Sequence, residues 1–186
     1  MRLLSIALLF VSSLVFSANT EYDGTWRAGC AGTQGAYSTE FIKIGDNKID
    51  YNVAVFGDAS CTNQYVDLKT SGTIDIGAMS QSTEMARDTQ IILSKITITP
   101  RSAFVAMMLN SKNMCGYNNW KANVEKDVAG KECDEKQMPK VGDSAYDLVS
   151  IQNSKLFYGE KTDENDGTTP EKRPKNLDKA RPFSKN

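Results

Sequence analysis

The stretch that decides the fold lies near the start of the chain and reads Tyr22-Asp23-Gly24-Thr25-Trp26-Arg27-Ala28-Gly29-Cys30. It brings one of the two tryptophans close to one of the four cysteines. A Gly shortly before a large ring is typical of a first strand whose aromatic side chain closes one end of a core, because a Trp ring buries a large apolar area. The stretch therefore predicts a β-strand and a core organised around Trp26.

The clearest alternation in the chain follows the turn Gly45-Asp46-Asn47. One face of the segment after this turn carries Ile49, Tyr51, Val53 and Val55, and the other face carries Asp50, Asn52 and Ala54. A period of two with one apolar face is typical of a half-buried antiparallel strand. The turn and the extended segment 37–44 before it predict a β-hairpin.

Other extended segments follow along the chain. Runs rich in β-branched and aromatic residues predict strands at 64–77, 90–99, 102–109, 146–151 and 155–159, and segment 121–128 can extend as another. Segment 102–109 is apolar on both faces, which favours a buried strand, although a helical turn gives the same pattern in so short a run. About eight short strands with regular turn signals and no long amphipathic helix predict an all-β antiparallel sandwich or barrel in one domain.

The ends of the chain differ from its middle. Residues 1–17 carry one basic residue and then an apolar run that ends in small residues, which predicts a secretory signal peptide removed on export. We expect the β domain to cover residues 18–160. Residues 161–186 are polar and rich in turn formers, so we expect a tail that is extended or disordered except where Leu177 and Phe183 dock.

Export makes the cysteine count informative. An even number of cysteines in an oxidising compartment predicts two disulfides, and three connectivities are open. The cysteines fall into an early and a late pair, which favours Cys30 with Cys61 and Cys115 with Cys133. A cysteine-ligated metal is the rival interpretation, but the chain has no Cys-x-x-Cys pair. The destination after export, periplasm or cell exterior, stays open.

Composition excludes several classes of function. The chain has no histidine, so triads with a His base and His-ligated zinc sites are excluded. With 22 basic and 23 acidic residues the charge is nearly balanced, which does not favour nucleic-acid binding. The acidic segment 163–166 lacks the ligand spacing of a calcium loop. We therefore predict no catalytic residues, no metal and no cofactor, and no segment after the signal peptide is apolar enough to span a membrane.

Gly24-Thr25-Trp26 resembles the Gly-x-Trp signature on the first strand of lipocalins. A wider set of motifs, with Phe56-Gly57-Asp58, Asn113-Met114-Cys115-Gly116 and Asp166-Gly167-Thr168, resembles a group of uncharacterised exported bacterial proteins. The lipocalin resemblance implies an up-and-down barrel of about eight strands. It also implies that Trp26 closes one barrel end beneath a late arginine, for which Arg173 and Arg181 are the candidates.

The interior of such a barrel is either a filled core or a cup for one small ligand. The predicted lining consists of Tyr51, Val53, Val55, Phe104, Met107 and Met108. Core packing is the favoured explanation of these side chains, because aromatic and Met side chains usually fill protein interiors. The lipocalin resemblance implies an apolar small molecule instead. We therefore predict an exported noncatalytic binding protein. The alternative is a protein-interaction module, an inhibitor or surface recognition factor, that binds a protein partner through loop 113–135 and the tail.

Overall fold

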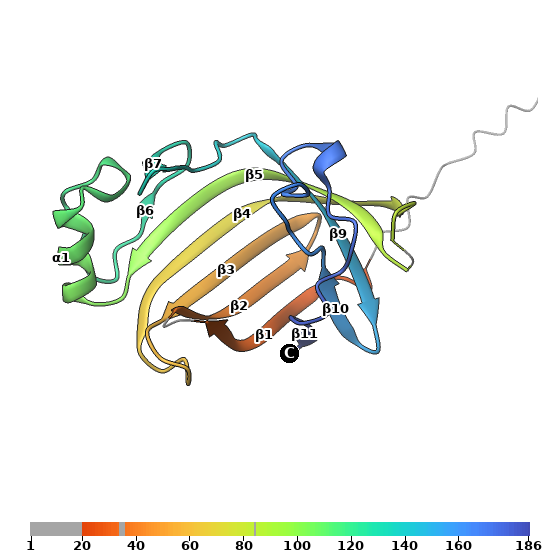
Figure 1. The fold of residues 1–186 in the computed structure, drawn as a ribbon, viewed down its shortest axis with the longest axis horizontal. Coiled ribbons are helices and arrows are strands. Elements are labelled where there is room, and N and C mark those ends of the chain that lie inside the picture. The colour runs from red at the N-terminus through yellow and green to blue at the C-terminus, as the bar shows by residue number, and fades with distance from the viewer. Residues whose placement is uncertain (1–19, 34–35, 84) are drawn as a thin grey trace, which may run out of the picture.

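A computed structural model describes residues 20–33, 36–83 and 85–186. The expected signal peptide at 1–17 lies outside these residues. The described residues form a closed antiparallel β-barrel of eight strands, which confirms the predicted all-β class (Figure 1). The barrel strands are β1 (Gly24–Thr33), β2 (Ala36–Gly45), β3 (Lys48–Phe56), β4 (Gln64–Met79), β5 (Arg87–Pro100), β9 (Ser144–Gln152), β10 (Lys155–Tyr158) and β11 (Phe183–Lys185).

Neighbouring strands follow one another up and down around the barrel, and two tight hairpins set their register. Asp46 and Asn47 have φ of 52° and 56° in the β2–β3 turn, and Asn153 and Ser154 have φ of 50° and 60° in the β9–β10 turn. Two-residue loops with positive φ at both positions match the twist of the flanking strands. Strand β4 is irregular in its pairing with β5, with a register shift between Ser71 and Gly72.

The barrel closes through the last residues of the chain. Strand β11 pairs with β10 on one side and with β1 on the other, where Lys185 lies opposite Trp26. Leu177 and Phe183 are buried. The barrel therefore extends beyond residue 160, where the sequence analysis ended the domain. Strand β11 has three residues, which is too short to show a periodic pattern in the sequence. The expected docking of Leu177 and Phe183 is present.

Trp26 closes one end of the barrel interior. Its side chain is 2% exposed, and its indole Nε1 donates a hydrogen bond to the Tyr22 carbonyl at 2.8 Å. The cation over the ring is Lys185, whose Nζ lies 5.1 Å from the ring centroid. The two expected arginines lie elsewhere, with Arg173 over Tyr146 and Arg181 paired with Glu40. A lysine from the last strand thus covers Trp26 where the resemblance implied an arginine.

A long excursion between β5 and β9 extends from one end of the barrel (Figure 1). It contains α1 (Ala103–Ser111), the short helix η1 (Met114–Gly116) and the two-residue strands β6 (Lys126–Asp127), β7 (Glu132–Cys133) and β8 (Lys136–Gln137). A second short helix, η2 (Pro170–Lys172), follows in the tail. Trp120 is the largest side chain in the buried cluster that joins this excursion to β5.

Segment 102–109 is a helix, so the predicted strand there is wrong. Pro100 ends β5, and the Ser102 side chain caps the new helix by accepting a hydrogen bond from the Val105 N–H. Val105 and Ala106 are buried on the inner side of α1. The predicted strand at 121–128 shrinks to Lys126–Asp127, because the backbone around it turns through Asn123 at a φ of 59°.

Both favoured disulfides are formed. Cys30–Cys61 joins β1 to the loop after β3, and Cys115–Cys133 joins η1 to β7. Bonds between segments far apart in sequence restrict the unfolded chain and so stabilise the fold. Within the described ranges, no helix is long and apolar enough to cross a membrane.

Candidate ligand cavity

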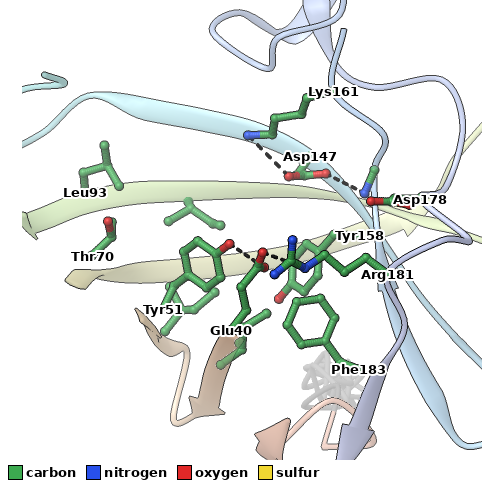
Figure 2. A pocket seen from close by; sticks show the side chains of 14 residues that line it. Glu40, Tyr51, Thr70, Leu93, Asp147, Tyr158, Lys161, Asp178, Arg181 and Phe183 are labelled. Atoms are coloured by element: carbon green, nitrogen blue, oxygen red, sulfur yellow. Dashed lines mark hydrogen bonds and ion pairs between the residues drawn. The ribbon is translucent and has the colours of Figure 1, made fainter. Parts of the chain in front are cut away.

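The barrel encloses a cavity of about 460 Å³ (Figure 2). Its walls are mainly apolar and come from most of the barrel strands. The apolar lining comprises Ile42, Ile49, Ile91, Leu93 and Phe183, and aromatic rings are added by Tyr51 and Tyr158. Because inward positions alternate along each strand, one stripe from each strand meets in the interior. This volume and this lining are typical of sites for small ligands.

A polar cluster lies on one wall of the cavity. The Tyr51 hydroxyl donates to Glu40 Oε2 at 2.6 Å, and Arg181 Nε lies 2.8 Å from Glu40 Oε1 (Figure 2). The Glu40 side chain is 13% exposed and that of Arg181 is 25% exposed. Burial and the neighbouring Glu40 raise the pKa of Tyr51 well above its ordinary value. The phenol is therefore a stable donor to the carboxylate.

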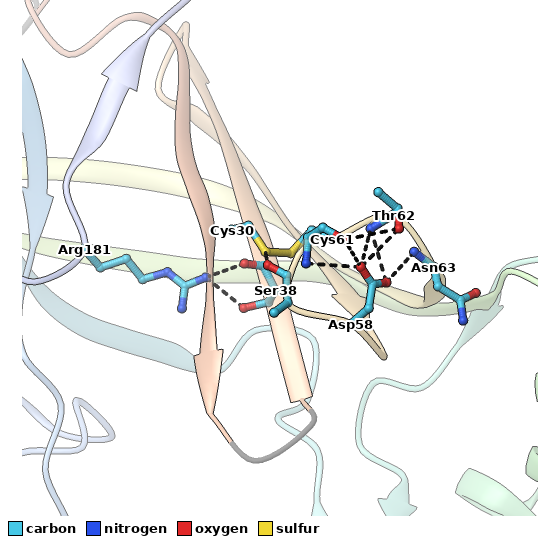
Figure 3. Close-up of a disulfide and its surroundings, with 9 residues drawn as sticks. Cys30, Ser38, Asp58, Cys61, Thr62, Asn63 and Arg181 are labelled. Atoms are coloured by element: carbon cyan, nitrogen blue, oxygen red, sulfur yellow. Dashed lines mark hydrogen bonds between the residues drawn. A yellow bond between two sulfur atoms is a disulfide. The ribbon is translucent and has the colours of Figure 1, made fainter.

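Arg181 also holds the tail against β2. Its Nη2 donates to the carbonyl of Ser38 at 3.1 Å and to the hydroxyl of Ser38 at 2.7 Å (Figure 3). The loop beyond the nearby Cys30–Cys61 bond is ordered by Asp58, which accepts hydrogen bonds from the backbone of Thr62 and Asn63. Hydrogen bonds from Ser60 and from this backbone lower the pKa of Asp58. The wall that carries Arg181 is thus fixed by contacts outside the cavity.

Asp147 and Lys161 form the second polar feature, where the cavity reaches the surface. Asp147 Oδ1 accepts hydrogen bonds from the backbone N–H of Leu148 at 2.8 Å and of Gly159 at 2.9 Å, and Oδ2 lies 3.6 Å from Lys161 Nζ. Burial raises the pKa of Asp147, although Lys161 and these N–H groups act in the opposite direction. Both oxygens therefore have partners that fix the carboxyl group in place.

Tyr158 differs from the other polar side chains of the cavity. Its hydroxyl oxygen is buried and has no hydrogen-bond partner within residues 20–33, 36–83 and 85–186. The ring packs edge to face against Phe183, with 5.9 Å between the ring centroids. Burial is the main cause that raises the pKa of Tyr158, and the nearby Asp147 adds to it. The site therefore contains a protonated phenol whose donor is unused.

The predicted lining residues fall in two places. Tyr51 lines the cavity. Val53 and Val55 continue the same face of β3, where they are half-buried outside the cavity lining. Phe104, Met107 and Met108 lie on the exposed side of α1, outside the barrel, and Phe104 is 64% exposed. The structure thus separates the methionines from the residues of β3, because the predicted strand that carried them is a helix.

Sequence reasoning did not find the polar residues of the cavity. Glu40 shares its strand face with the buried Ile42 and Ile44, so a carboxylate at an inward position was a signal available in the sequence. Tyr158 and Arg181 offered no comparable signal, because the last strands are short. Their position in the cavity depends on the closure of the barrel by β11.

The described residues thus define a closed eight-stranded antiparallel barrel with two disulfides and an internal cavity. No family model matches the chain, and a search of the curated proteins finds no match. The eight-stranded barrel is consistent with the fold that the resemblance to lipocalins implied.

Proposed function

We propose that the protein is an exported, noncatalytic binding protein that holds one small molecule inside the barrel. The observation that carries this proposal is the cavity of about 460 Å³ with apolar walls and a polar cluster at one side. The predicted signal peptide and two formed disulfides support export to an oxidising compartment. The lining favours a ligand with an apolar body and a polar group, a refinement of the apolar ligand expected from the sequence.

A noncatalytic role is supported by how the charged groups of the cavity are used. Glu40 is bonded to Tyr51 and Arg181, and Asp147 is bonded to two backbone N–H groups and lies beside Lys161. A general acid or base must exchange a proton with the substrate, whereas these carboxylates are held by partners within the protein. Fixed groups of this kind are suited to binding and orienting a ligand.

The test fills the cavity with a large side chain from one strand. The same substitution at an exposed position of that strand serves as the control. Thr70 lines the cavity from β4, whereas Thr73 on the same strand is exposed. We expect Thr70→Trp to fold and to lose small-molecule binding, and Thr73→Trp to bind like the wild type. Native mass spectrometry of protein purified gently from its own host, before and after organic extraction, measures the bound mass.

The proposal is supported if organic extraction releases a bound mass from the wild type and from Thr73→Trp, and if Thr70→Trp carries no such mass. An equal bound mass in all three proteins would move the site outside the barrel. If none of the proteins carries a ligand or takes up an apolar dye, the binding function would have to be abandoned.

A second candidate is the protein-interaction module, and it is favoured by the exposed apolar side chains of α1. Phe104, Met107 and Met108 extend from the excursion that includes loop 113–135. Replacing that loop would expose the buried Trp120, so the sharper test changes the surface only. Serine at all three α1 positions should abolish a specific partner interaction if this candidate is correct, and should leave ligand binding unchanged.

A further inference from the structure

We infer that the cavity selects an uncharged amphiphile whose polar head accepts a hydrogen bond from the Tyr158 hydroxyl. This inference rests on the proposed binding function and adds the chemical class of the ligand and the residue that recognises its head. Long-chain alcohols, ketones and esters belong to this class. Free fatty-acid anions and cationic amphiphiles do not.

Tyr158 lines the cavity, and its hydroxyl oxygen is buried and has no hydrogen-bond partner among the described residues (Figure 2). Buried polar groups in proteins are almost always hydrogen-bonded, so one without a partner requires an explanation. Its raised pKa keeps the proton on the oxygen, so the group is available to donate. A ligand oxygen that accepts this bond would satisfy it.

The rest of the cavity wall requires a ligand with an apolar body. Phe183 packs against the Tyr158 ring, and Ile42 and Ile49 line the same cavity. A ligand head bonded to Tyr158 would therefore place its attached chain against apolar side chains. Burial of that chain supplies most of the affinity, whereas the hydrogen bond supplies orientation and selectivity.

The charged groups of the cavity disfavour an ionic ligand head. Glu40 pairs with Arg181, and Asp147 pairs with Lys161. The half-buried Asp178 is a further acidic residue in the cavity lining. Asp147 lines the same cavity as Tyr158, so an acidic group belongs to the wall that the ligand head would meet. An anionic head would be repelled there, and a cationic head would lose its hydration where Glu40 and Asp147 already have cationic partners. A neutral acceptor avoids both penalties.

The experiment uses the mature protein, its Tyr158→Phe variant and four probes with the same alkyl chain: dodecane, dodecanol, dodecanoate and dodecyltrimethylammonium. Displacement of a neutral apolar fluorescent dye reports the affinity of each probe. We expect dodecanol to bind about tenfold more tightly than dodecanoate or the ammonium probe. Tyr158→Phe should weaken dodecanol binding about five- to tenfold, as one hydrogen bond implies, and leave dodecane unchanged.

Tyr117→Phe is the matched control, because the Tyr117 hydroxyl donates to the Asp127 carbonyl at 2.9 Å outside the cavity. It should not change the affinity of any probe. In the absence of ligand, Tyr158→Phe should unfold at the same or a higher denaturant concentration than the wild type, because the hydroxyl it removes has no partner. A lower midpoint would assign the hydroxyl a structural role and overturn the inference.

The outcomes separate the inference from the proposed function. Binding of dodecane and dodecanol with no effect of Tyr158→Phe would overturn the inference and leave the binding function supported. Tighter binding of dodecanoate or of the ammonium probe would also overturn the inference alone. If the dye and all four probes fail to bind, the proposed function itself is overturned.

Discussion

The two ends of the barrel interior use the same strands in different ways. At the apolar end, Trp26 is surrounded by Ile44, Ile74, Val149 and Leu156, and all of these side chains are buried. At the polar end, the interior is hollow, and Glu40, Tyr51, Asp147 and Arg181 face the cavity. We use the terms apolar end and polar end for these two sets of residues.

This difference shows how one closed sheet can serve stability and binding together. Close packing of large apolar side chains supplies most of the free energy of folding, and a cavity gives up part of it. Confining the packed core to one end leaves the other end able to hold a ligand and fixed polar groups. Substitutions at the two ends should therefore differ in what they change.

The largest effect is expected for Trp26→Ala at the apolar end. Removal of a buried aromatic side chain costs about 3–5 kcal/mol in the free energy of unfolding. Phe104→Ala is the matched control, because Phe104 is 64% exposed, and it should change the free energy by less than about 0.5 kcal/mol. Urea denaturation measures both. Equal losses would mean that Trp26 does not organise the core.

A smaller effect is expected for Glu40→Gln at the polar end, which removes the ionic partner of the partly buried Arg181. We expect a loss of about 1–2 kcal/mol, below the cost of a fully buried pair because both side chains retain some exposure. Glu125→Gln breaks the exposed pair with Lys95 and should cost clearly less, because solvent screens that pair. If the two variants lose equal stability, the Glu40–Arg181 pair contributes no more to the free energy of unfolding than an exposed ion pair does.

The polar end should also respond to pH through Asp147. Its folded-state pKa is raised above the ordinary value of 3.8, so the folded protein holds this proton to higher pH than the unfolded chain. The contribution of Asp147 to stability is therefore present below that value and is lost as pH rises through the folded pKa. Relative to the wild type, Asp147→Asn should become more stable as pH increases from about 4 to 7.

Asp166 supplies a control of opposite sign. Hydrogen bonds from Thr168 lower the pKa of Asp166, so its contribution is present above 3.8 and is lost as pH falls. The stability cost of Asp166→Asn should therefore shrink in acid. Unfolding midpoints at a series of pH values measure both variants, and parallel pH profiles would contradict the assignment of Asp147 to a desolvated site.

The sequence predicted the features that depend on local pattern. The alternation from Ile49 to Val55 predicted β3, the turn Gly45-Asp46-Asn47 predicted the β2–β3 hairpin, and cysteine spacing favoured both disulfides. Helix α1 was missed, because the apolar run of segment 102–109 fits a buried strand until the Ser102 cap is recognised. Local pattern therefore identified the all-β class, and the resemblance to lipocalins supplied the closed barrel. The short apolar segment that follows Pro100 and begins at the capping Ser102 was misread as a strand.

The candidate site was harder to predict than the fold. Tyr51 was found because it belongs to a long alternating strand. Glu40, Tyr158 and Arg181 meet only after β11 closes the barrel, so their proximity depends on pairing between distant parts of the chain. Sequence alone does not give the distance between such residues, and the inward position of Glu40 beside Ile42 and Ile44 was the one signal available.

The smallest effect is expected for Lys185, which covers Trp26 from outside the core. Its ammonium lies 5.1 Å from the ring centroid, and because the side chain is exposed the cation–π contact is worth about 0.5–1 kcal/mol. Lys185→Met should lose this amount and Lys185→Arg should retain it, as measured by urea denaturation. If both variants match the wild type, the apolar end depends on packing alone. A loss close to that of Trp26→Ala would instead make the covering cation an essential part of the closure, and the distinction between a packed apolar end and a charged polar end would fail.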